Sequence, residues 1–309
     1  MNLPEFIRIP LFRNYLKRKG ALGFPPQVSI ETTNICNLNC AMCPRQFMKR
    51  KLGVMDFKLF QKIISEISGK NIKELSFHLF GEPLVKPELL FKMLDYAERK
   101  MPKTKLTFSE NGVLLNKENS IRILKSPLNR ITLSLDGATK KTYEKLRRNG
   151  NFEIVMKNVE NFMILKRKIN PSIEAELQII KTTENSNEIS AFKRKWRPFL
   201  GKNDMITIKE FTTFGGKIKD ISIKSLSRKA RRFARNLMPC RALWLTLNIH
   251  WNGDVVACCL DCDGSLKLGN CKKQTLSEII NGEKMQKLRE MSINMSLKKI
   301  PLCAGCYGS

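Results

Sequence analysis

The chain has 309 residues, 42% of them hydrophobic, and its 56 lysines and arginines against 28 acidic residues give a formal net charge of +28. This length and apolar content exclude a disordered chain and allow one large domain with a smaller appendage. The charge either reflects a lysine-biased composition or creates a positive field that attracts phosphorylated and other anionic partners.

Residues 1–27 form a basic segment in which apolar side chains stand among arginines and lysines. Such a segment lies on an anionic membrane surface or packs against its own chain, and we expect the packing. It lacks the unbroken apolar core of a secretory signal. No stretch of the chain approaches the roughly 20 apolar residues that a membrane span needs, so we expect a cytoplasmic protein.

Beyond residue 27, apolar strands alternate with amphipathic helical stretches. Strands are predicted at 27–33, 72–80, 104–110, 129–136, 172–180 and 204–211. Helices are predicted at 55–68, 87–100, 116–125, 151–168 and 186–199. This order predicts an α/β fold with parallel strands that close or partly close into a barrel over residues 28–211. Chemistry is expected at the C-terminal ends of the strands.

The alternation stops near residue 212. Residues 212–239 are basic and contain glycine, which is typical of a linker, and we expect a short helix in it. In the segment 240–309, Asn252 and Gly253 separate two apolar runs and predict a β-hairpin. A helix near 275–290 follows. We therefore expect a small cysteine-rich α+β domain at the C-terminal end.

The ten cysteines favour metal ligation over a disulfide framework, because a cytosolic compartment keeps thiols reduced. Three of them, Cys36, Cys40 and Cys43, follow the first predicted strand with the spacing Cys-x3-Cys-x2-Cys. Four thiolates would saturate a four-iron cluster, whereas three leave one iron open to another ligand. Chance cysteines, or a zinc site completed by a distant cysteine, are the alternatives.

This motif, placed directly after the first strand, resembles that of the radical S-adenosylmethionine (SAM) superfamily, and the resemblance covers residues 28–211. It implies a partial (β/α)6 TIM-like barrel in which Cys36, Cys40 and Cys43 hold a 4Fe-4S cluster. The open iron would bind SAM, whose reductive cleavage gives a 5'-deoxyadenosyl radical that abstracts hydrogen from a substrate. The reductant would be an external donor such as flavodoxin or ferredoxin.

Further motifs after successive strands resemble SAM-binding motifs of the same family. They are FGEPL (80–84), SENG (109–112) and SLDG (134–137), followed by the segment KTTENSNEI (181–189). Two departures are Glu110, where the family usually has threonine, and Met42, where many members have an aromatic residue. The SAM-binding residues that the resemblance implies are Glu82, Asn111, Ser134, Asp136 and Asn185.

The C-terminal cysteines resemble those of a SPASM domain in its single-cluster form, often called twitch. The patterns are C-x12-G-x4-C and C-x2-C. The resemblance implies an auxiliary 4Fe-4S cluster held by Cys240, Cys258, Cys303 and Cys306, and a structural zinc is the rival. The remaining cysteines are expected to be ordinary buried residues, although Cys259 competes with Cys258 as a ligand. They are Cys259, Cys262 and Cys271.

Other polar residues have weaker claims. His78 alternates with Phe80 on the second strand and either points into the barrel near the substrate or is a satisfied strand residue. Basic residues follow the cysteine loop and the fourth strand, and they either bind a phosphate or carboxylate or form a solvated face. They are Arg45, Lys49, Arg50, Lys51, Arg147 and Arg148.

The leading hypothesis is a radical SAM enzyme that carries out net oxidation, with the auxiliary cluster accepting the second electron. Many peptide maturases of this kind carry an N-terminal recognition domain, whereas this barrel begins near residue 28. That start favours a small anionic metabolite as the substrate, and a peptide maturase is the alternative. A basic nucleic-acid-binding protein with a structural metal is the hypothesis from another class, but it does not explain the strand-end residues.

Overall fold

The computed structural model describes residues 5–18, 20, 22–223, 238–304 and 306. The short helix expected in the linker falls mainly on 224–237, outside the described residues. The strands are β1 (Gln27–Ile30), β2 (Glu74–Ser76), β3 (Lys105–Glu110), β4 (Arg130–Ser134), β5 (Glu174–Lys181), β6 (Met205–Glu210), β7 (Thr246–Ile249), β8 (Asp254–Val256) and β9 (Lys267–Asn270).

The helices predicted between the barrel strands are present, and further helices accompany them. They are α1 (Glu5–Arg18), α2 (Phe57–Ile67), α3 (Pro87–Lys100), α4 (Lys117–Lys125), α5 (Lys140–Leu146), α6 (Phe152–Ile169), α7 (Ile189–Trp196), α9 (Ala242–Leu245), α10 (Leu276–Asn281), α11 (Glu283–Ile293) and α12 (Pro301–Ala304).

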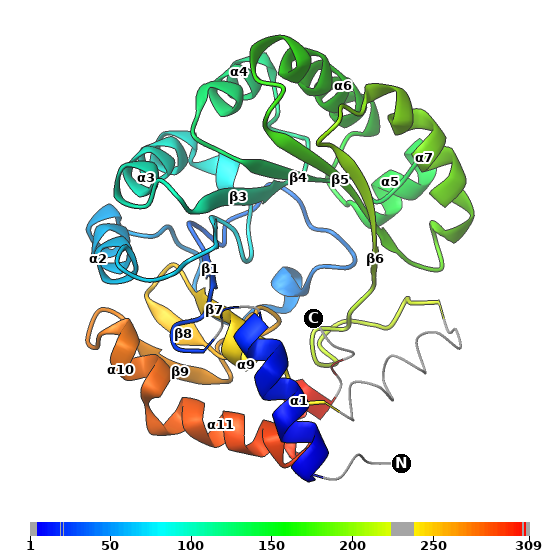
Figure 1. Cartoon of the computed structure of the whole chain (residues 1–309). Coiled ribbons are helices and arrows are strands. Elements are labelled where there is room, and N and C mark those ends of the chain that lie inside the picture. Colours follow the sequence, from blue (N-terminus) through cyan, green and yellow to red (C-terminus); the bar gives the residue numbers. More distant parts are fainter. Residues whose placement is uncertain (1–4, 19, 21, 224–237, 305, 307–309) are drawn as a thin grey trace.

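One nine-stranded sheet organises the molecule, in the order β6-β5-β4-β3-β2-β1-β7-β8-β9. The first six strands pair in parallel, as the alternation predicts. They curve into a partial barrel with α2, α3, α4, α6 and α7 on its outer side (Figure 1). β6 is an edge strand and does not pair with β1, so the barrel stays open on that side.

The cysteine-rich segment extends the sheet of the barrel. β7 pairs in parallel with β1, with Gln27 opposite Thr246 and Ile30 opposite Ile249. β8 and β9 then continue as antiparallel neighbours, which confirms the predicted hairpin. The sequence separated these segments into two modules, whereas the hydrogen bonds of the sheet join them directly.

The two faces of each barrel strand differ in character. α2 shows the apolar side, because its buried residues Phe60, Ile63 and Ile64 pack in the core that also contains the strand residues Ile30 and Leu75. Successive strand residues point to opposite faces, so the residues between these apolar positions lie on the inner face. The inner face carries polar residues such as Ser29, Ser76 and Thr107, which stand side by side in the strand register.

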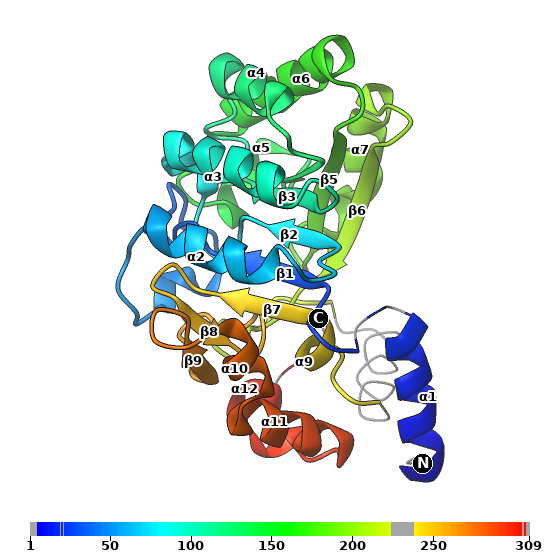
Figure 2. The same cartoon turned by 60° about the vertical axis from the view of Figure 1, so that its left-hand side comes forward.

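The helical segments near the two ends of the chain differ in detail from the sequence prediction. The helix expected near 275–290 is two helices, α10 and α11, because Gly282 has an extended backbone (φ −70°, ψ 162°) and serves as C-cap of the first and N-cap of the second. α1 packs on its own chain: Phe12 and Leu16 are buried, and the Phe12 ring meets the Trp244 ring of α9 edge-on at 5.0 Å. Figure 2 shows α1 at the periphery, on the side of the molecule where α9 lies. Among the described residues, no helix is both long and apolar enough to cross a membrane.

Candidate functional site

The loop after β1 carries the three closely spaced cysteines. Cys40 is 8% exposed, and the three thiols lie in a small apolar cluster that also includes Leu38 and Phe211. Burial raises the pKa of all three thiols, that of Cys43 to about 12. An empty site therefore holds the thiols protonated, and cluster binding must release those protons because only the thiolate ligates iron.

The FGEPL and SENG motifs meet at this loop. The Glu82 carboxylate accepts hydrogen bonds from the backbone N–H of Leu84 and of Asn111, both at 3.1 Å. The Asn111 amide donates to Asn37 Oδ1 at 2.8 Å, and its Nδ2 lies 4.0 Å from Cys36 Sγ. Burial raises the pKa of Glu82 to about 8. A cation placed beside this buried carboxylate would keep it ionised.

Glu110, the unusual residue of the SENG motif, is 2% exposed. One carboxylate oxygen accepts a hydrogen bond from the Gly112 N–H at 2.7 Å, while Oε1 has no hydrogen-bond partner. Burial, and then the nearby Glu82 charge, raise the pKa of Glu110 well above its usual range. The side chain therefore closes the turn that carries Asn111, and its burial favours the neutral form over the charged one.

Asp136 of the SLDG motif is fully buried and forms an ion pair with Arg147. Arg147 Nε donates to Asp136 Oδ2 at 2.7 Å, and Ile180 N–H donates to Oδ1 at 2.6 Å. The Arg147 Nη1 atom lies 3.8 Å from Cys40 Sγ. Arg147 thus contacts the cysteine loop directly while it pairs with Asp136, a role that no local sequence signal indicates.

The two remaining SAM candidates also have protein partners. Gln178 Nε2 donates to Ser134 Oγ at 3.4 Å. Asn185 is fully buried, its amide donates to the carbonyls of Asp136 and Ile180 at 2.9 and 2.8 Å, and its Oδ1 accepts from Thr182 N–H. Its side chain braces the two loops, and a SAM contact for these residues stays a prediction.

The segment after β6, predicted as a linker, packs over the cysteine loop. Its residues Phe211 and Ile218 are buried in the same apolar cluster as Cys40 and Met42. Thr183 N–H donates to the Ile221 carbonyl at 2.9 Å, which ties the segment to the end of β5. This segment adds an apolar cover to the cysteine site that sequence reasoning missed.

The four C-terminal cysteines predicted as ligands line one apolar cavity together with leucine and alanine side chains. They are Cys240, Cys258, Cys303 and Cys306. In the part of the chain that the structure describes, no three His, Cys, Asp or Glu side chains converge as ligands of a single metal ion. Zinc needs its four sulfur atoms about 2.3 Å from one point. A four-iron cluster binds each thiolate to a different iron, so its ligands are further apart and need not converge on one point.

The leftover cysteines are absent from that cavity lining. Cys271 is fully buried, and its Sγ donates to the Gly253 carbonyl at 3.1 Å. Cys262 is 1% exposed. Cys259 shares a hydrogen bond with Cys258, and this bond, followed by burial, raises the pKa of Cys258 well above its usual range. Cys262 and Cys271 are buried, as expected, whereas Cys259 is partly exposed, and a non-ligating role for the three stays a prediction.

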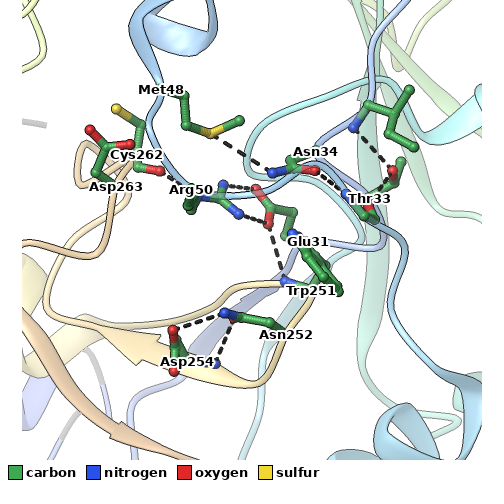
Figure 3. A network of polar contacts seen from close by, with 12 residues as sticks. Glu31, Thr33, Asn34, Met48, Arg50, Trp251, Asn252, Asp254, Cys262 and Asp263 are labelled. Carbon is green, nitrogen blue, oxygen red and sulfur yellow. Dashed lines mark hydrogen bonds and ion pairs between the residues drawn. The ribbon is translucent and has the colours of Figure 1, made fainter.

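A polar network links the cysteine loop after β1 to the cysteine-rich C-terminal segment, called the auxiliary segment from here on (Figure 3). Arg50 forms two hydrogen bonds with the fully buried Glu31 at the end of β1. Arg50 Nε also donates to the Cys262 carbonyl at 2.5 Å, and Trp251 N–H donates to Glu31 at 3.1 Å. The sequence offered two roles for Arg50, a ligand for a substrate anion or part of a solvated face, whereas its guanidinium is engaged inside the protein.

Comparison with known proteins identifies two regions of the chain. The Radical SAM superfamily model matches residues 30–169, and the iron-sulfur cluster-binding SPASM domain matches residues 240–307. The first match contains the cysteine loop and the strand-end motifs, and the second contains all four cysteines of the apolar cavity.

Two curated relatives illustrate the similarity. Mycofactocin maturase MftC of Mycobacterium ulcerans is 29% identical over 171 residues, covering 55% of this chain and 44% of that protein. The chain thus aligns with less than half of that relative. The antilisterial bacteriocin subtilosin biosynthesis protein AlbA of Bacillus subtilis is 24% identical over 322 residues, covering 96% of this chain and 70% of that protein.

Solved structures share the architecture. SuiB of Streptococcus suis, bound to its precursor peptide SuiA, has a TM-score of 0.67 at 18% identity, covering 89% of this chain and 68% of that chain. BtrN in complex with AdoMet and 2-DOIA has a TM-score of 0.61 at 17% identity, covering 92% and 93%. At these identities the likeness shows the fold alone.

Proposed function

We propose that this chain, which belongs to the radical SAM superfamily and carries a C-terminal SPASM domain, is an enzyme that modifies a peptide. The two domains imply a SAM-binding 4Fe-4S cluster, SAM itself and an auxiliary iron-sulfur cluster. The observation that carries the proposal is the meeting of Cys36, Asn37, Glu82 and Asn111 at the C-terminal ends of parallel strands.

The choice of a peptide substrate revises the expectation of a small anionic metabolite. The relatives include a maturase and a bacteriocin biosynthesis protein, and the second aligns with 96% of this chain. These similarities support the peptide alternative better than the metabolite. The structural likeness to BtrN does not reverse this choice, because at 17% identity it concerns the fold.

Each residue of the first cysteine site has a separate role in this proposal. Cys36, Cys40 and Cys43 would hold the cluster, which supplies one-electron reduction of SAM when it is present. Glu82 would accept hydrogen bonds from the ammonium group of SAM. Asn111, which donates to Asn37 Oδ1, would orient the loop. The segment after β6 packs apolar side chains in the same cluster as the thiols, which would limit the access of water to them.

The second site is suited to electron transfer. Cys240, Cys258, Cys303 and Cys306 line one cavity. As ligands they would occupy all four positions of a four-iron cluster and leave no iron open. Such a cluster would supply one-electron chemistry: it could take the electron that a substrate radical loses after hydrogen abstraction, which is compatible with a net oxidation of the peptide. An external donor such as flavodoxin or ferredoxin would reduce the first site.

The test is anaerobic incubation of iron-reconstituted protein with SAM and dithionite, followed by measurement of 5'-deoxyadenosine. We expect the native chain to form this product and Cys40→Ala to form none. Cys271→Ala is the matched control, because Cys271 is equally buried but lies outside both cysteine sites. Continued product formation by Cys40→Ala would refute the ligand assignment.

The substrate class needs a separate experiment. Candidate precursor peptides encoded beside this chain are co-expressed with it, and their masses are compared with those from the Cys40→Ala strain. We expect a loss of hydrogen from one peptide with the native chain alone. Salt-dependent binding of RNA without SAM cleavage would instead support the nucleic-acid hypothesis.

A further inference from the structure

A buried ion pair lies where the cysteine loop meets the auxiliary segment. Glu31 has a fully buried side chain, and the Arg50 side chain is 11% exposed. Their fork-to-fork contact consists of two hydrogen bonds, at 2.7 Å between Nη1 and Oε2 and at 2.5 Å between Nη2 and Oε1. A bidentate pair of this kind fixes the orientation of both side chains as well as their distance.

The same two residues hold backbone groups of the auxiliary segment. Arg50 Nε donates to the carbonyl of Cys262, which lies in the loop that begins with Cys258, and Glu31 accepts from the N–H of Trp251 in the hairpin turn. The Arg50 guanidinium also lies 5.7 Å from the centre of the ring of Phe80, the first residue of the FGEPL motif. One guanidinium thus contacts Glu31 after β1, the FGEPL motif after β2 and the loop that contains Cys262.

Neighbouring contacts tie the same two segments together. Lys49 N–H donates to Asp263 Oδ1 at 2.7 Å. Trp251 Nε1 donates to the Lys51 carbonyl at 3.3 Å, and a Cβ atom added to Gly53 would come within 2.4 Å of the Trp251 ring. The stretch 49–53 therefore packs closely against the stretch 251–263.

These stretches continue directly into the two sets of cysteine ligands. The stretch 49–53 continues the loop that carries Cys36, Cys40 and Cys43, and the 251–263 stretch contains Cys258. A displacement of either loop must disturb Arg50, because its three engaged N–H groups have partners on both sides. A rigid fork with partners on both loops can transmit such a displacement, whereas a flexible lysine ammonium would absorb it.

We infer that Arg50 is a positioning residue that couples the two cysteine sites, so that filling the auxiliary site improves the binding of SAM at the first site. This inference rests on the proposed function. An ordered auxiliary loop keeps the Cys262 carbonyl against Arg50, Arg50 holds Glu31, and Glu31 sets the start of the cysteine loop. The coupling is reciprocal, so SAM also stabilises the auxiliary loop.

The experiment is a double-mutant cycle that measures SAM affinity by the change that SAM causes in the paramagnetic signal of the reduced first cluster. Cys303→Ala removes an auxiliary ligand. In the native background we expect this substitution to weaken SAM binding by about fivefold or more, in the range usual for allosteric coupling. In an Arg50→Met background the same substitution should leave the affinity unchanged.

Controls separate coupling from damage to the fold. Lys51→Met removes an exposed neighbouring charge and should retain the native coupling. If Arg50→Met fails to fold because Glu31 is left buried and alone, the double variant Glu31→Gln, Arg50→Met removes both charges and replaces it in the cycle. Arg50→Lys keeps the charge without the fork and should lose most of the coupling.

Two results would overturn the inference. One is an equal effect of Cys303→Ala in the native and Arg50→Met backgrounds, and the other is no effect in either background. A native protein whose cluster signal does not respond to SAM at all would instead contradict the proposed function, so the two failures are distinguishable.

Discussion

Replacing Asp136 by asparagine tests whether the buried pair beside Cys40 is charged and essential for the fold. Asn has the same shape and also tolerates the positive φ of 56° found at this position. The substitution therefore does not strain the backbone at residue 136. It leaves the Arg147 guanidinium without its counter-charge, and the Arg147 side chain is only 10% exposed. The Ile180 N–H also loses a charged acceptor.

The magnitude follows from that burial. Removing one partner of a buried ion pair costs about 3–5 kcal/mol. Natural domains are stable by about 5–15 kcal/mol, so the loss is a large fraction of the total free energy of unfolding. The assay is urea unfolding of the metal-free protein at pH 7, followed by circular dichroism. Glu160→Gln is the control, because its pair with Lys195 is about one-third exposed and should contribute about 0–1 kcal/mol.

In the double variant Asp136→Asn, Arg147→Met no charge is left buried, so part of the lost stability should return. A loss below about 1 kcal/mol for Asp136→Asn alone would refute the buried pair as a structural brace. The role of the Asp136 carboxylate would then be the SAM contact that the SLDG motif implies, and not stabilisation of the fold.

Three further predictions concern other parts of the molecule. Cys303→Ala should lower the iron content and stop peptide modification while retaining 5'-deoxyadenosine formation at saturating SAM, whereas Cys271→Ala should do none of these; iron analysis and product assays check both. Gly81→Ala should destabilise the first site, since Gly81 has a φ of 85° and a Cβ there would come within 2.4 Å of a backbone oxygen; unchanged SAM affinity and melting temperature would contradict this. Burial lowers the pKa of His250 to about 4, so as pH falls from about 6.5 to 4 the unfolded chain binds a proton that the folded chain does not. His250 should therefore lower the free energy of unfolding by about 1.4 kcal/mol for each pH unit of acidification over this range. In His250→Gln, urea unfolding at each pH should show a decrease that is smaller by this contribution.

Much of the barrel was predictable because its signals are local. The strand expected at 104–110 is β3 (Lys105–Glu110), and the helix expected at 87–100 has those bounds. Apolar periodicity encodes each element within a short window. The helix near 275–290 was placed correctly but not divided, since the extended backbone of Gly282 is not evident from periodicity.

The first cysteine site was also encoded locally, by the spacing of Cys36, Cys40 and Cys43 and by motifs that follow successive strands. Parallel strands bring their C-terminal ends to one edge, so the order of the motifs already predicts that Glu82 and Asn111 meet there. The pairing of Arg147 with Asp136 was not foreseen, because nothing in the local pattern distinguishes this arginine from Arg148.

The sequence by itself therefore determined the order of the elements, the cysteine-rich loop and the set of cysteines at the second site. Only the tertiary structure decided that β7 pairs with β1, that Arg50 binds Glu31 rather than a substrate anion, and that Phe211 covers the thiols. These contacts join segments far apart in the chain. Their stability depends on three-dimensional burial and hydrogen-bond geometry, which a linear pattern of residues does not specify.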